Sequence, residues 1–158
     1  MKLSELVNVD AIRLRLHAKT KREAIAELVD LLEAGHGCRS QGEFLKQVLL
    51  REDGQTTGIG NGVAIPHGKA RAAERMMAAC AVAPEGLDFE SEDGQPAQLF
   101  VLFVSPENTA TLQVKVLANI SRIFKEESVR RTLREARSPQ EFLAALQAAE
   151  AAYIPTTT

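Results

Sequence analysis

Residues 57–69 read Thr-Gly-Ile-Gly-Asn-Gly-Val-Ala-Ile-Pro-His-Gly-Lys, and this run combines three closely spaced glycines with a proline-histidine-glycine turn. Each glycine permits a positive φ and leaves a bare backbone N–H, as a loop that wraps around an anion or another ligand requires. The apolar residues 63–65 predict a short buried strand, and Pro66 fixes φ at its exit. We therefore expect His67 at a strand end, held by rigid neighbours and reachable from solvent. The alternative interpretation is a glycine-rich hairpin with an incidental histidine, and the spacing alone leaves both open.

The length and composition of the chain indicate one globular domain. It has 158 residues, of which 45% are hydrophobic and 25% charged, enough for a full hydrophobic core. The formal net charge of -2 argues against nucleic-acid binding, because no dense positive field is available to neutralise phosphates. No apolar run is long enough for a membrane span, and the N-terminus shows no signal-peptide pattern. The expected location is therefore cytoplasmic.

Apolar patterning predicts the strands. Alternation over residues 12–17 indicates a half-buried strand, whereas uninterrupted apolar runs at 76–83 and 99–104 indicate strands that are covered on both faces. Pro84 is expected to end the first of these runs. Between the two runs, residues 85–96 predict a loop or an edge hairpin.

Amphipathic periodicity predicts helices at residues 20–35, 40–51, 108–124, 128–137 and 138–152. Three of them begin with a capping motif, in which a hydroxyl residue precedes a glutamate by three positions: Thr20 with Glu23, Ser40 with Glu43, and Ser138 with Glu141. Apolar strands separated by such helices predict an α/β fold, a single domain with a mixed β-sheet flanked by helices on both faces. We expect the domain to span residues 1–152, followed by a flexible C-terminal tail at 153–158.

The cysteines and the other histidines suggest no further chemistry. Cys38 and Cys80 form neither a metal-ligand spacing nor a C-x-x-C redox pair, and Cys80 is expected to be a small buried hydrophobe. His36 lies near Cys38, but two candidate ligands without a third are usually part of a loop, so we expect no metal. His17 falls on the polar face of its predicted strand and is expected to be solvated.

Arg51 ends the helix that leads into the glycine-rich run. A cation in the last turn of a helix is common, because it interacts favourably with the helix dipole. The other interpretation is that Arg51 reaches across to an anion site formed by the loop and His67. Its planar guanidinium suits a phosphoryl group better than a lysine would.

The pair Arg51-Glu52, followed by residues 57–69, closely resembles the phosphorylation-site signature of IIA domains of the bacterial phosphotransferase system, in the fructose and mannitol class. Within that class, the nitrogen-regulatory IIA branch looks most similar. The resemblance spans most of the chain, because the strand at 99–104, the helix after it and the Ser138 capping motif also fit. It implies that His67 accepts a phosphoryl group from the phosphocarrier HPr, or its nitrogen-branch counterpart, and carries it as tele-phosphohistidine.

The resemblance also implies supporting residues. Arg51 corresponds to the arginine that contacts the phosphoryl group, and the other expected contributors are Thr57, Gly58, Gly60, Asn61 and Thr111. Thr111 is a departure, because the family usually has a second histidine at this place and no histidine follows His67 in this chain. A threonine offers only a neutral hydroxyl, so the efficiency of onward transfer is left open.

The chemistry fits a transfer between histidines. One neutral imidazole nitrogen must point at the donor phosphorus while a hydrogen bond to the other fixes the tautomer. Loop N–H groups and Arg51 would offset charge in the transition state, and no metal or cofactor is required. The chain lacks a Walker-type sequence, so we do not expect ATP as the direct donor.

We hypothesise a phosphocarrier, a component of the phosphotransferase system, that regulates partner proteins through its phosphorylation state. The expected partners are an HPr-like donor and a downstream regulatory protein. The lack of an attached transmembrane or IIB-like segment in these 158 residues favours this hypothesis over a IIA subunit that passes phosphate to the IIB protein of a sugar transporter. A third hypothesis is a binding module with the same fold that no longer transfers phosphate. The exposed face around His67 would suit a transient partner or a homodimer contact.

Overall fold

The centre of the structure is an antiparallel pair of strands, β5 (Met77–Leu87) and β6 (Ala97–Ser105), in which nearly every residue is buried. The computed structural model describes residues 1–155. Its sheet has the order β1-β5-β6-β3-β2, and β4 also pairs with β6. The outer strands are short: β1 (Ile12–Arg13), β2 (Gly58–Gly60), β3 (Val63–Ala64) and β4 (His67–Lys69).

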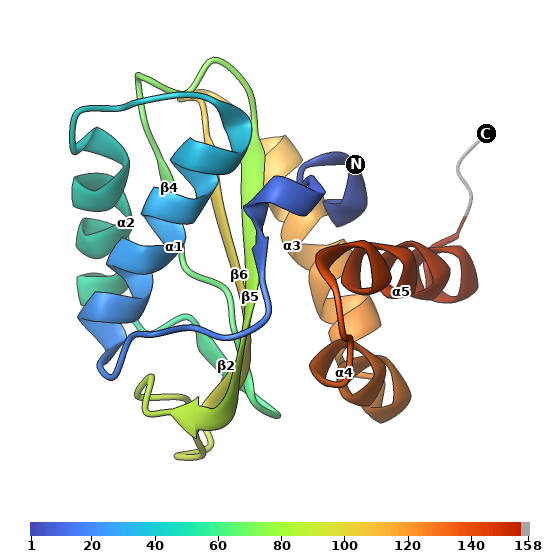
Figure 1. Cartoon of the computed structure of the whole chain (residues 1–158). Helices are drawn as coiled ribbons and strands as arrows, with labels where there is room; N and C mark the ends of the chain where they lie inside the picture. Colours follow the sequence, from blue (N-terminus) through green and yellow to red (C-terminus); the bar gives the residue numbers. More distant parts are fainter. Residues whose placement is uncertain (156–158) are drawn as a thin grey trace.

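Parallel and antiparallel pairs alternate in this sheet. β3 and β4 run parallel to β6, and β1 runs parallel to β5, whereas β2 is antiparallel to β3. Helices α1 (Lys21–His36) and α2 (Glu43–Gly54) cover one face, and α3 (Ala110–Phe124), α4 (Glu127–Arg134) and α5 (Pro139–Tyr153) cover the other (Figure 1). Two 3-10 turns, Leu3–Glu5 and Val9–Ala11, complete the elements. The predicted mixed α/β fold is therefore confirmed.

Local signals placed several element ends correctly. The hydroxyl of Thr20 accepts a hydrogen bond from the Glu23 N–H at 3.2 Å, and the Ser138 hydroxyl accepts one from the Glu141 N–H at 3.0 Å. Cys80 is fully buried, and burial raises the pKa of its thiol to about 12. This thiol therefore packs as an inert apolar group.

Two strand predictions were wrong in extent. The strand expected at 12–17 is regular only at Ile12–Arg13: Leu16 still donates to the Val82 carbonyl of β5, but the N–H groups of His17 and Ala18 donate to the Glu27 carboxylate of α1 instead. In the other case, β5 does not end before Pro84 but continues to Leu87. The register of its ladder with β6 shifts between Val82 and Leu87, and this irregularity accommodates a residue that has no N–H to donate.

The predicted helix boundaries also need correction. Helix α1 ends at His36 instead of residue 35, because Gly37 adopts a left-handed φ of 65° as the cap. Helix α2 begins at Glu43 and continues past Arg51 to Gly54; the Ser40 capping box does not form, because the Glu43 carboxylate accepts the Ala72 N–H instead.

On the opposite face of the sheet, α3 begins at Ala110 instead of residue 108, and α4 covers Glu127–Arg134 instead of 128–137. The last helix includes Tyr153, the first residue of the predicted tail, and residues 156–158 of that tail lie outside the described residues. No helix within residues 1–155 combines the length and the apolar composition that a membrane crossing needs.

Helix α2 lies very close to β4 at Gly68. A Cβ atom at this glycine would lie 3.0 Å from the backbone nitrogen of Val48 and 3.1 Å from the carbonyl carbon of Gln47. These neighbours are main-chain atoms of a helix, so neither can move aside without moving α2. The small size of Gly68 therefore sets the distance between the helix that carries Arg51 and the strand that carries His67.

We predict that Gly68→Ala lowers the free energy of unfolding by about 1–3 kcal/mol, because the added methyl group overpacks this contact. Chemical denaturation of wild type and variant measures the difference. Gly54→Ala is the matched control, since a Cβ at this helical glycine meets nothing within 4 Å. It should be neutral or stabilise the protein by up to about 1 kcal/mol. Equal effects of the two substitutions would contradict the packing argument.

Candidate functional site

The His67 ring is held from two directions. Its Nδ1 atom lies 2.7 Å from the carbonyl oxygen of Ile65. A carbonyl oxygen can only accept, so Nδ1 carries the ring proton and Nε2 keeps its lone pair. Phe103, the register partner of His67 on β6, stacks on the ring with centroids 4.9 Å apart and planes 5° from parallel. Both the tautomer and the orientation of the imidazole are therefore fixed by the fold.

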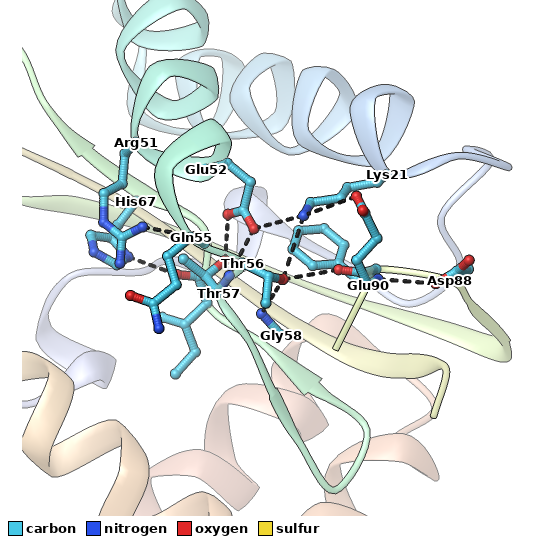
Figure 2. Close-up of polar contacts among 12 residues, drawn as sticks. Lys21, Arg51, Glu52, Gln55, Thr56, Thr57, Gly58, His67, Asp88 and Glu90 are labelled. Carbon is cyan, nitrogen blue, oxygen red and sulfur yellow. Dashed lines mark hydrogen bonds and ion pairs between the residues drawn. The ribbon is translucent and has the colours of Figure 1, made fainter. Parts of the chain in front are cut away.

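The expectation that His67 is reachable from solvent was wrong, because the residue is only 5% exposed. It begins β4 and lies between the sheet and the last turn of α2, so Phe103 covers one side of the ring. Figure 2 shows the Arg51 side chain reaching from α2 to the imidazole. The expectation of rigid neighbours is met by these same contacts.

Burial lowers the pKa of His67 below its usual range, and the positive charge of Arg51 acts in the same direction. The hydrogen bond to Ile65 and the negative charge of Glu52 oppose this shift without cancelling it. The ring is consequently neutral near pH 7. A neutral imidazole with Nδ1 protonated offers Nε2 as a nucleophile.

Arg51 lies at the end of α2 and beside His67, and its contact with an anion there stays a prediction. It lies in the last turn of α2, where its Nη1 donates to the carbonyl oxygen of Gln55 at 2.9 Å, and its side chain also reaches His67 (Figure 2). Within residues 1–155 no carboxylate forms an ion pair with Arg51. Its charge is therefore available to an anion beside the imidazole.

No role was expected for Glu52, although it stands in the Arg51-Glu52 pair of the signature. Its carboxylate is buried and accepts hydrogen bonds from the backbone N–H of Thr57 at 2.7 Å and from the hydroxyl of Thr57 at 2.6 Å. Lys21 forms an ion pair with the same carboxylate at 3.0 Å (Figure 2). The sequence did contain a signal, because Glu52 follows the apolar Val48 by four positions and so lies on the buried face of α2.

Thr57 is brought into the site, but Gly60 and Asn61 are not. The residues between β2 and β3 form a hairpin whose strand β3 pairs with β6 at Leu99, whereas His67 pairs at Phe103. These positions are four residues apart along β6, which corresponds to about 13 Å. The hairpin turn around Asn61 therefore lies at the other end of the strand.

The N–H groups of the glycine-rich run are largely engaged with protein acceptors. Thr57 donates to Glu52, Gly58 to the Thr56 hydroxyl at 3.1 Å, and Asn61 to the Asp93 carboxylate at 3.0 Å. Gly58 also packs against the loop that joins β5 and β6. At Thr57, Gly58 and Asn61 the interpretation as an anion cradle was thus wrong, because these N–H groups are engaged within the hairpin that the alternative proposed.

Thr111 is exposed in the first turn of α3, and its hydroxyl forms no hydrogen bond with any residue among 1–155. Strand β6 leads from Phe103 to Ser105 and then into this helix, so Thr111 lies toward the same end of the sheet as His67. Among residues 1–155, no three histidine, cysteine or acidic side chains gather into a possible metal site.

Comparison with known proteins shows which family the chain belongs to. The model of the family described as "Phosphoenolpyruvate-dependent sugar phosphotransferase system, EIIA 2" matches residues 5–149. A nitrogen regulatory protein of Bradyrhizobium diazoefficiens is 34% identical over 146 residues, which cover 92% of this chain and 95% of that protein. The fructose-specific EIIA component of Haloferax volcanii is 33% identical, covering 87% of this chain and 90% of the relative.

The fructose-specific EIIABC component of Bacillus subtilis is 33% identical over 138 residues, but the matched part is only 22% of that longer protein. Among solved structures, the nitrogen regulatory protein IIA-Ntr of Neisseria meningitidis aligns with a TM-score of 0.83 and 29% identity, over 90% of this chain and 97% of that one. The mannitol IIA enzyme of Escherichia coli, in complex with its phosphorylated IIB enzyme, aligns with a TM-score of 0.76 and 26% identity, over 89% and 96%.

The matched family covers nearly the whole described fold, including the strand of His67 and the helix of Arg51. The chain therefore belongs to the EIIA type-2 family of the phosphoenolpyruvate-dependent sugar phosphotransferase system, and it is a phosphohistidine carrier of that system.

Proposed function

We propose that His67 is the phosphoryl acceptor of this carrier and that Nε2 is the atom that bonds to phosphorus. The observation that carries the proposal is the 2.7 Å hydrogen bond between Nδ1 and the Ile65 carbonyl, which leaves Nε2 unprotonated. His17 and His36 are the other histidines of the chain. His17 is exposed, and the Nε2 atom of His36 is already bonded to the carbonyl oxygen of Ala78 at 2.9 Å.

The transfer is an in-line displacement at phosphorus. The Nε2 lone pair of His67 forms the new N–P bond as the N–P bond to the donor breaks, and the electron pair of that bond returns to the donor imidazole. Positive charge develops on the His67 ring, where the Ile65 carbonyl stabilises it through Nδ1–H. Arg51 offsets the negative charge of the phosphoryl oxygens. The donor is an HPr-like phosphocarrier, itself phosphorylated on histidine.

Within this family we propose a regulatory role of the nitrogen-branch kind. It is supported by the full-length match to the Bradyrhizobium nitrogen regulatory protein and by the fold similarity to the Neisseria protein. A second candidate is a IIA subunit that hands phosphate to a IIB protein of a sugar transporter. Its support is the fructose-specific relative of similar length and the solved complex of the mannitol IIA and phosphorylated IIB enzymes.

Phosphorylation mapping tests the acceptor. We expect incubation with phosphoenolpyruvate, the first enzyme of the system and HPr to give an acid-labile, base-stable phosphate on His67, identified by mass spectrometry of peptides kept at alkaline pH. His67→Gln should take up no phosphate, whereas the control variants His17→Gln and His36→Gln should be labelled like wild type. Label that persists in His67→Gln would refute the assignment, and an unlabelled wild-type protein would favour the binding module.

A titration tests the protonation state. Because burial lowers the pKa of His67, we expect its ring to stay mostly neutral at pH 6.5, where a histidine of ordinary pKa is about half protonated. The unfolded chain takes up this proton first, so wild type should lose stability relative to His67→Gln as the pH falls below about 6.5. Nitrogen-15 NMR of the ring and urea denaturation at several pH values measure both effects. The expectation is contradicted if the His67 ring of the folded protein has a titration midpoint at or above that of the chain unfolded in urea.

A capture experiment tests the regulatory role. Phosphorylated and unphosphorylated protein are immobilised side by side, and bound proteins from the source cell are identified by mass spectrometry. We expect a partner other than a IIB protein to bind in only one of the two states, because phosphorylation changes the charge beside Arg51. Recovery of only a sugar-specific IIB protein would establish the transporter role instead. His67→Gln, which cannot be phosphorylated at this site, is the control.

A further inference from the structure

Glu52 and Lys21 form a buried ion pair next to the proposed acceptor, with no part in the transfer described above. Glu52 is 5% exposed and the Lys21 side chain 16%, and their charged groups lie 3.0 Å apart. Lys21 also approaches Glu90 at 3.4 Å and lies 4.9 Å from the centre of the Phe89 ring. Withdrawing such charges from water is costly, and well-packed apolar side chains often stabilise a fold as much or more. This pair therefore calls for a role other than stability.

The carboxylate of Glu52 is fully used. One oxygen accepts the Thr57 hydroxyl, and the other accepts the Thr57 N–H and the Lys21 ammonium. Three donors thus converge on two oxygens, and only a carboxylate can accept from all of them. Glutamine in this place would offer one oxygen and would turn an N–H group toward another donor.

A chain of hydrogen bonds leads from Glu52 to the imidazole. Thr57, which Glu52 fixes through two bonds, accepts the Ile65 N–H on its carbonyl oxygen at 3.0 Å. Ile65 in turn accepts Nδ1–H of His67 on its own carbonyl oxygen at 2.7 Å. The backbone position that sets the histidine tautomer therefore depends on the Glu52 carboxylate.

The same carboxylate also anchors the helix that supplies Arg51. Glu52 and Arg51 are neighbours in the last turn of α2, where few backbone hydrogen bonds hold the helix end. Figure 2 shows the two side chains leaving this turn in different directions, Arg51 toward His67 and Glu52 toward Thr57 and Lys21. One buried group thus ties the helix end to the segment that carries Ile65.

We propose that Glu52 is a positioning residue for phosphoryl acceptance, with Lys21 as its counter-ion. Glu52 keeps Arg51 and the Ile65 carbonyl in the correct positions relative to the His67 ring. The inference rests on the proposed role of His67. Among residues 1–155 Glu52 forms no hydrogen bond with the His67 ring, and it acts through Thr57 and through the helix end. Small displacements of such groups reduce reaction rates strongly, because the attacking atom must stay aligned with phosphorus.

The test compares Glu52→Gln with Asp53→Asn, which removes an exposed carboxylate from the same turn of α2 by the same chemical change. We expect Glu52→Gln to slow the phosphorylation of His67 by HPr roughly 10- to 100-fold, whereas Asp53→Asn proceeds at the wild-type rate. Nitrogen-15 NMR of the ring should show protonated Nδ1 in wild type and a mixture of tautomers in Glu52→Gln. A loss of stability alone would not change the tautomer of the folded protein.

A wild-type rate together with a wild-type tautomer in Glu52→Gln would overturn the inference. If wild-type His67 takes up no phosphate, the proposed function fails, while a changed tautomer in Glu52→Gln still supports the positioning role. If Glu52→Gln does not fold, substitutions of Thr57 test the same hydrogen bond through its donor. Thr57→Val loses the hydroxyl that Glu52 accepts, and it should be slower than Thr57→Ser, which retains it; equal rates would count against the inference.

Discussion

The parallel pairing of β3 and β4 with β6 is the constraint on which the site depends. It places His67 beside Phe103 and Val63 beside Leu99, so the two ends of the glycine-rich run are separated along one central strand. The imidazole gains an aromatic neighbour that is itself held in the core, and the hairpin turn is directed elsewhere. Because β6 is buried along almost its whole length, a shift of this register would expose apolar side chains and is strongly disfavoured.

The site combines a neutral imidazole, the proposed nucleophile, with the buried ion pair of Glu52 and Lys21. Burial keeps His67 unprotonated, which transfer chemistry needs, but the same burial would penalise any isolated charge nearby. Glu52 is compatible with that environment because Lys21 and the two donors of Thr57 surround it. Arg51 avoids the penalty by staying at the exposed end of α2. Within the described residues 1–155, Arg51 has no ion-pair partner, and it lies beside the neutral ring of His67.

Sequence patterns predicted what depends on neighbouring residues. The strand β6, the Ser138 cap and the burial of Cys80 follow from local apolar runs and from bonds that span three residues. The failures involve distant partners. The N–H group of Ala72, far along the chain from Glu43, donates to the carboxylate that a capping box would have used. The N–H group of Asn61, which we expected to be free for an anion, donates to the carboxylate of Asp93. Neither competitor is visible in a pattern confined to one segment.

The burial of His67, the proposed acceptor, also bears on how a partner can sense its phosphorylation state. His67, Glu52 and Thr57 are all buried, so the exposed side chains around them supply most of the surface on which a partner protein docks. With the phosphoryl group on Nε2, as proposed, about 1.5 to 2 negative charges would be added beside an exposed arginine. The change in surface charge at Arg51 would then be the main signal. A regulator and a transporter subunit could share this chemistry, since the exposed side chains around it decide which partner binds.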